Sequence, residues 1–141
     1  MRAVDHVEAF DTTVQKTYEW LHELDEEMGT ENVRRAYEMM RAYLHALRDR
    51  LPIQEAAQLA AQMPMLLRGV YYEGWRPSHK PDKMHADEFL EYVAREGLLD
   101  GPEEAEVAVR ASTAVLLRHV SAGEMVDVLS TLPEDIRQIL S

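Results

Sequence analysis

The residue pair whose types and spacing most resemble a catalytic arrangement is Glu19 and His22, which stand three positions apart. On a helix such residues share a face, and this spacing supplies a carboxylate and an imidazole ligand in the di-iron centres of helical bundles. A di-iron centre needs a second such pair and two further glutamates. The only comparable pair, Asp82 and His85, begins in a proline-rich segment, and His22 stands beside an acidic run at residues 25–27. We therefore predict a solvated helix face at this position.

A second set of side chains with metal-binding chemistry lies in and just after the proline-rich segment: His79, Asp82, His85 and Asp87. Nitrogen and oxygen atoms of these types bind divalent ions, but their spacing fits no compact metal motif. The chain also has no cysteine, which excludes thiolate nucleophiles and cysteine-bound zinc or iron–sulfur clusters. It contains no nucleophile-elbow, P-loop or dinucleotide-loop motif. The sequence thus predicts no metal, no cofactor and no enzymatic activity.

Residues 68–77 gather the side chains that dominate protein interfaces and that stack on flat ligands: Arg68, Tyr71, Tyr72, Trp75 and Arg76. Two interpretations are open. Trp75 is a clasp packed between two halves of the chain, or the set lines a groove for a partner or ligand. In both cases we predict that the Trp75 ring is mostly buried, with Arg68 and Arg76 beside it.

The charge of the chain is strongly negative but unevenly distributed. The net charge is −11, which argues against nucleic-acid binding because phosphate backbones require a surplus of basic residues. Residues 1–33 and 84–141 carry net charges of −7 and −8, whereas residues 34–83 carry +4. Within this middle block Arg34, Arg41 and Arg48 recur every seven residues, which predicts a basic stripe on one helix face. The stripe pairs with the acidic outer blocks, within the fold or in a dimer, or it binds an acidic partner or a phosphate ligand.

Apolar residues recur at helical spacing along nearly the whole chain, and no segment alternates apolar and polar residues as a strand does. The first run predicts a helix that packs through an apolar stripe and stops at Gly29: Val7, Phe10, Val14, Leu21, Leu24 and Met28. Thr30 is the expected N-cap of the next helix, and Ser121 with Glu124 forms an expected capping box. Glycines and prolines separate further helices at about 30–51, 53–62, 64–73, 87–96, 102–120, 121–132 and 133–140. The predicted fold class is all-α with about eight helices.

The order of these helices occurs twice along the chain. Shifting the sequence by 69 residues places Trp20 on Phe89, Glu55 on Glu124 and Pro64 on Pro133 without a gap. Helical periodicity alone does not align a proline with a proline. We therefore predict one domain over residues 1–141, built as two packed four-helix pseudo-repeats. The halves span residues 7–73 and 86–140, and a Pro/Gly loop at 74–85 joins them.

Several segments together resemble a known bacterial family, the domain of unknown function numbered 2267. The resemblance rests on Arg34-Arg35-Ala36-Tyr37, on residues 44–51 and 60–64, on Tyr72-Glu73-Gly74-Trp75-Arg76-Pro77, and on residues 121–133. It covers nearly the whole chain. It implies an all-helical bacterial protein whose relatives lie among general stress genes, and it supplies no catalytic residue to carry over.

The longest apolar run, residues 63–67, is far short of the roughly 20 residues that span a bilayer, and the N-terminus shows no signal-peptide pattern. We expect a cytoplasmic protein. Its predicted function is a non-enzymatic interaction or adaptor module that binds a protein partner or a second copy. The alternative is a small-molecule or lipid-binding protein with a pocket between the repeats.

Overall fold

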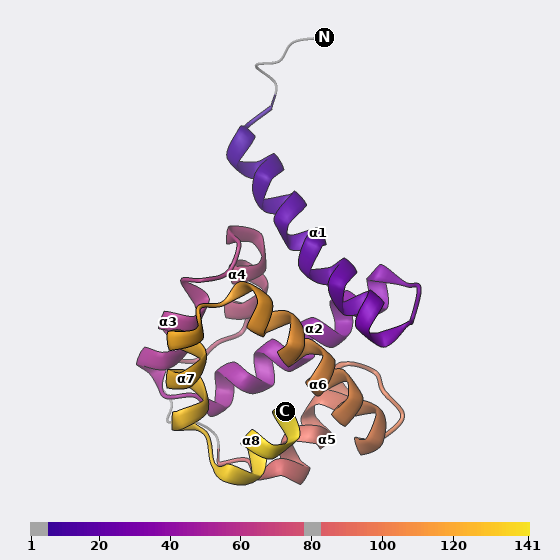
Figure 1. Ribbon diagram of the computed structural model, residues 1–141, viewed down its shortest axis with the longest axis vertical. Coiled ribbons are helices and arrows are strands. Elements are labelled where there is room, and N and C mark those ends of the chain that lie inside the picture. The colour runs from indigo at the N-terminus through magenta and orange to yellow at the C-terminus, as the bar shows by residue number, and fades with distance from the viewer. Residues whose placement is uncertain (1–5, 78–82) are drawn as a thin grey trace.

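The computed structural model describes residues 6–77 and 83–141, and over these residues it consists of eight α-helices without a strand (Figure 1). Their bounds are α1 Glu8–Met28, α2 Val33–Arg50, α3 Ile53–Ala60, α4 Met65–Tyr72, α5 Ala86–Glu96, α6 Pro102–His119, α7 Ala122–Thr131 and α8 Glu134–Leu140. The predicted all-α class is confirmed. No helix of the described part is long and apolar enough to cross a membrane.

Most helix ends lie where glycine and proline predict them. Gly29 adopts a left-handed conformation with φ of 66°, and its amide donates to the carbonyl of Asp25, which closes α1. Leu51 is extended before Pro52, which ends α2. Pro102 opens α6.

One predicted cap is wrong and one predicted capping box forms only in part, and in both places another side chain makes the missing bond. Asn32, not Thr30, caps α2 by accepting from the Arg35 amide, while the Thr30 hydroxyl donates to the Asp25 carboxylate. Ser121 caps α7 by accepting from the Glu124 amide at 3.2 Å.

The Glu124 carboxylate, however, does not return to the Ser121 amide. The side-chain oxygen of Gln62 accepts from that amide at 2.8 Å. The expected capping box is therefore only half formed, and the Glu124 carboxylate points elsewhere.

The helices pack in the same pattern in each half of the chain. Helix α1 packs against α2 and α4, and α5 packs against α6 and α8. Between the halves, α1 packs on α6 and α2 on α5, while α2 also meets α6 and α3 meets α7. This set of contacts is unchanged when the two halves are exchanged.

The offset of 69 residues also appears in the helix bounds. The second, third and fourth helices of each half begin 69 positions apart, and α2 and α6 both have 18 residues. Arg68 donates to the carbonyls of residues 60 and 63 at the end of α3, and Arg137 donates to those of residues 129 and 132 at the end of α7. Superposing residues 17–70 on 86–139 is the direct test of the predicted duplication.

Candidate functional site

The predicted set at residues 68–77 divides into residues that support the fold and residues that face solvent. Tyr71 is fully buried, and its hydroxyl donates to the carbonyl of Ala56 at 2.9 Å. The Arg68 guanidinium donates to the carbonyls of Ala60 and Met63 at the end of α3. Neither side chain is free to bind a partner.

Tyr72 and Trp75 lie together, with their ring centroids 5.2 Å apart and their planes 22° from parallel. The Trp75 ring is only half-buried, whereas the sequence predicts it mostly buried, because it packs at the rim of the core beyond the end of α4. Its aromatic partner is Tyr72, and no described arginine stacks on it. Arg76 is exposed.

The basic stripe does not form one surface. Arg48 is only 4% exposed, and its guanidinium donates to the carbonyls of Tyr71 and Glu73 and to the Asp49 carboxylate, each at 2.8 Å. Arg41 is half-buried and pairs with the Glu73 carboxylate at 3.0 Å. Arg34 alone of the three is exposed.

The acidic partners of Arg41 and Arg48 come from residues 34–83 themselves and not from the acidic outer blocks of the same chain, while the predicted pairing in a dimer stays a prediction. Arg48 pairs with Asp49, and Arg41 pairs with Glu73. The outer blocks instead pair with each other, since Arg118 on α6 bonds to two glutamates of α1, Glu23 and Glu27. The three arginines are evenly spaced along α2. Helix α4 packs over the C-terminal end of α2, so it covers Arg48 and leaves Arg34 exposed.

The histidine groups are not assembled into a metal site within the described residues. His79 and Asp82 lie outside the described residues. His22 stacks on Tyr18 with centroids 6.0 Å apart, and His85 lies 3.5 Å from the Asp135 carboxylate. Asp87, in the first turn of α5, faces solvent.

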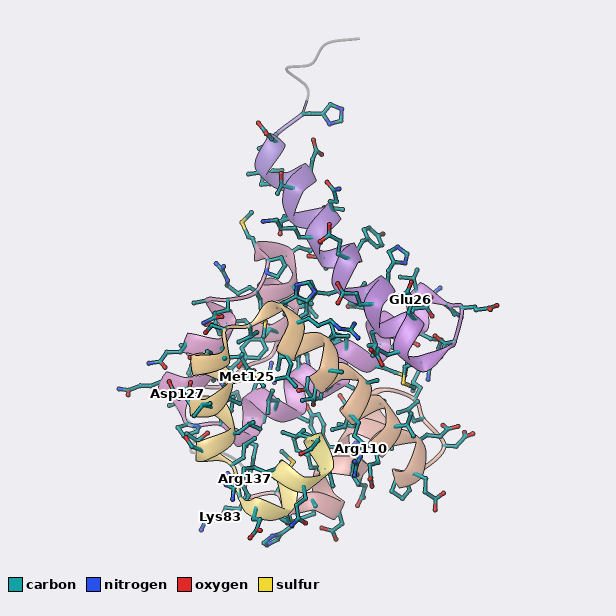
Figure 2. All side chains as sticks on the ribbon, in the orientation of Figure 1. Glu26, Lys83, Arg110, Met125, Asp127 and Arg137 are labelled. Atoms are coloured by element: carbon teal, nitrogen blue, oxygen red, sulfur yellow. The ribbon has the colours of Figure 1, made fainter. Side chains whose placement is uncertain are left out.

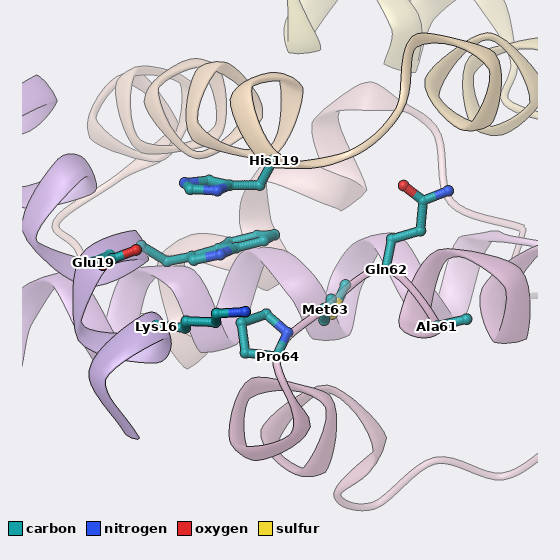
Figure 3. A pocket seen from close by; sticks show the side chains of 8 residues that line it. Lys16, Glu19, Ala61, Gln62, Met63, Pro64 and His119 are labelled. Atoms are coloured by element: carbon teal, nitrogen blue, oxygen red, sulfur yellow. The ribbon is translucent and has the colours of Figure 1, made fainter. Parts of the chain in front are cut away.

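A recess of about 320 Å³ lies between the two halves, beside a stacked pair of rings (Figure 3). The His119 ring at the end of α6 stacks on the Trp20 ring of α1, with the ring centroids 4.6 Å apart. Nε2 of His119 lies 2.9 Å from the Glu23 carboxylate. Lys16 and Gln62 line the recess with exposed polar groups. It is therefore an open, mixed-polarity recess.

The largest feature that the sequence did not predict is an uncovered apolar face on α1. The N-terminal half of this helix projects beyond the other helices (Figure 1). Phe10, Val14 and Tyr18 lie four residues apart on one face and are 60%, 41% and 50% exposed. The predicted apolar stripe is thus buried only from Thr17 onward, because no described helix covers this face of its first two turns.

This face continues into a groove of about 570 Å³, which we call the α1–α4 groove. Its walls come from three helices: Val14, Tyr18 and Leu21 of α1, Val33, Arg34 and Tyr37 of α2, and Leu66, Leu67 and Val70 of α4. Leu66 and Tyr37 are 43% and 38% exposed. Among the described residues of the wall, Arg34 alone is charged.

Sequence reasoning also missed a cluster of three carboxylates, from Glu55 on α3 and from Glu124 and Asp127 on α7. Burial and the neighbouring carboxyl of Glu55 raise the pKa of Glu124 to about 7. The sequence contains one indication of this cluster, because the shift by 69 residues places Glu55 on Glu124.

The chain belongs to the family described as "Uncharacterized conserved protein (DUF2267)", whose model matches residues 17–139. The predicted family is confirmed. A search of curated proteins finds no match to the chain.

Proposed function

We propose that this chain is a non-enzymatic interaction module that self-associates through the exposed face of α1 and the α1–α4 groove. The observation that carries the proposal is the uncovered apolar stripe of α1, because large apolar side chains gathered on one surface are typical of interaction sites. Fully burying one such side chain stabilises a complex by about 1.5–3 kcal/mol.

A second copy is the occupant that the pattern of charges favours. In a two-fold dimer with antiparallel α1 helices centred on Val14, residue numbers that sum to 28 face each other, so Phe10 of one copy meets Tyr18 of the other. Asp11 then lies opposite residue 17, next to the groove that Arg34 lines. Asp11 of one copy is therefore expected to lie near Arg34 of the other.

The test is the molar mass and dissociation constant of the protein by sedimentation, with Phe10→Asp as the disrupting variant. The control is Val107→Asp on α6, because Val107 is 57% exposed and does not line the α1–α4 groove. We expect a dimer for the parent and the control. Phe10→Asp should weaken it by roughly 30-fold or more, because each substitution enters the interface twice.

A charge exchange adds specificity to the test. Asp11→Arg and Arg34→Asp should each weaken the dimer, and the double variant should restore it. A parent that is monomeric at high concentration, or a dimer that Phe10→Asp leaves intact, refutes the proposed self-association. Binding only to lipid vesicles or to an unrelated helix also refutes it.

One observation favours a second candidate, small-molecule binding between the halves. The recess beside Trp20 and His119 has about the volume of a small ligand site, and it is lined by residues of the first half and by His119 of the second. Its polar rim suits a small polar molecule better than a lipid. A ligand that co-purifies in native mass spectra of the parent, and is lost in His119→Ala, would support this candidate.

A further inference from the structure

A pair of glutamates faces each other where α3 meets α7, and this contact joins the two halves of the chain. Glu55 and Glu124 stand in the first turns of the two helices, and Asp127 follows one turn later on α7. Asp127 is exposed, and Figure 2 labels it on α7 at the left of the molecule. The cluster is thus open to solvent on one side.

The geometry brings one carboxylate oxygen of each residue within 4.8 Å of the other two. Glu124 is only 8% exposed, and its Oε2 is shielded from water without a hydrogen-bond partner. Oε2 of Glu55 is shielded in the same way. Among the described residues, no basic side chain forms an ion pair with any of the three.

The local hydrogen bonds explain why Glu124 is available. Gln62 accepts from the Ser121 amide, which would otherwise bind the Glu124 carboxylate in a capping box. Gln62 also donates to the Ser121 hydroxyl at 3.1 Å, so Gln62 binds both the amide and the hydroxyl of Ser121. The Glu124 side chain therefore turns toward Glu55.

Facing carboxylates with shielded oxygens repel each other unless one of them is protonated or a cation lies between them. We propose that Glu55, Glu124 and Asp127 bind one divalent cation of the size of Ca²⁺. The donors are all carboxylate oxygens, which are the preferred ligands of hard cations.

The chemistry of the site favours Ca²⁺ over Mg²⁺. Ca²⁺ accepts irregular arrangements of oxygen ligands, whereas Mg²⁺ demands a near-octahedral arrangement and loses its water reluctantly. The three carboxylate oxygens lie within 4.8 Å of one another, which is close enough for all of them to contact one Ca²⁺. Water enters from the side of Asp127 and completes the coordination.

The bound ion would join α3 to α7 and so tie the two halves of the chain together. This role is independent of the proposed dimer, because the cluster and the exposed face of α1 share no residue. Because the site has three carboxylates and is open on one side, we expect a dissociation constant of roughly 0.1–1 mM.

The experiment is calorimetric titration and thermal unfolding of the full chain at about pH 8, after chelator treatment, with Ca²⁺ or Mg²⁺ at constant ionic strength. At a free concentration about ten times its dissociation constant, Ca²⁺ should raise the Tm by roughly 4 °C. Mg²⁺ should bind at least tenfold more weakly.

Glu124→Gln is the test variant, and Glu134→Gln is its control. Both remove one charge from the first turn of a helix, but Glu134 lies at the start of α8, away from the cluster. We expect the Ca²⁺ response to vanish in Glu124→Gln and to persist in the control. The side-chain amide that Glu124→Gln introduces can donate to the Glu55 carboxylate, so this variant should fold without the ion.

If Glu124→Gln fails to fold, Asp127→Asn on the exposed side of the cluster gives the same test. Equal Ca²⁺ responses in Glu124→Gln and Glu134→Gln would overturn the proposal. So would a parent that shows neither binding heat nor a rise in Tm. Equal affinity for Mg²⁺ would overturn the preference for Ca²⁺.

Discussion

Replacing Arg48 by methionine tests whether the basic stripe supports the fold. Its guanidinium donates to the carbonyls of Tyr71 and Glu73 at the end of α4 and to the Asp49 carboxylate. Methionine keeps much of the length and apolar contact but donates no hydrogen bond. Hydrogen bonds from a charged group contribute about 1.5–3 kcal/mol each, so losing those to the two carbonyls should destabilise the fold by about 3–5 kcal/mol.

The change is measured as the free energy of unfolding in urea, followed by far-ultraviolet circular dichroism, and as the Tm. For a chain of this length, about 3–5 kcal/mol corresponds to a drop in Tm of roughly 10–20 °C. Arg34→Met is the matched control from the same helix. Arg34 is exposed, so its loss should change the stability of the monomer, measured at a dilution where no dimer forms, by less than about 0.5 kcal/mol.

The reasoning is refuted if Arg48→Met unfolds within about 1 kcal/mol of the parent, because a buried guanidinium with three acceptors cannot then be supporting the end of α4. Equal destabilisation by Arg34→Met would refute it in another way. It would mean that positive charge along α2, and not the specific contacts of Arg48, stabilises the protein.

Three further substitutions test the packing around α4. Trp75→Ala removes a half-buried ring stacked on Tyr72 and should cost about 1.5–3 kcal/mol in urea unfolding, less than a fully buried tryptophan; an unchanged midpoint would contradict this packing. Tyr71→Phe removes the bond to the Ala56 carbonyl and should cost about 1–2 kcal/mol, whereas no loss would mean that the bond is not formed. Burial lowers the pKa of His45, whose Nε2 lies 2.7 Å from the Val70 carbonyl, so the unfolded chain takes up a proton more readily. The urea midpoint should therefore fall as the pH drops below about 6.5, and less so in His45→Gln; equal slopes would show that another group is responsible.

Helix positions were predictable because they depend on local chemistry. Gly29 stops α1 through its left-handed backbone, and the prolines at 52, 64, 102 and 133 exclude or favour helix at defined positions. The N-cap of α2 was missed because Thr30 and Asn32 are both good caps by type. Only the structure shows that Thr30 is already bonded to Asp25.

What each helix face meets was much less predictable. The apolar spacing of α1 is the same before and after Thr17, yet only the second half is covered. Likewise, Arg34 and Arg48 share a face of α2, but one is exposed and the other is buried beneath the end of α4. Periodicity defines a face, whereas the length and position of neighbouring helices decide whether that face is buried.

The carboxylate cluster shows which sequence signal can carry information about tertiary contact. Aligning the chain with itself pairs Glu55 with Glu124, and the alignment alone suggests a shared helix-start role. The packing of α3 against α7 changes this interpretation, because it places these two positions against each other. When apolar residues meet in this way they extend the core. Two carboxylates that meet repel each other, so a proton or a cation is needed to stabilise the contact. A pair of acids that coincides in a self-alignment therefore marks a place where two halves can build a site that neither contains alone.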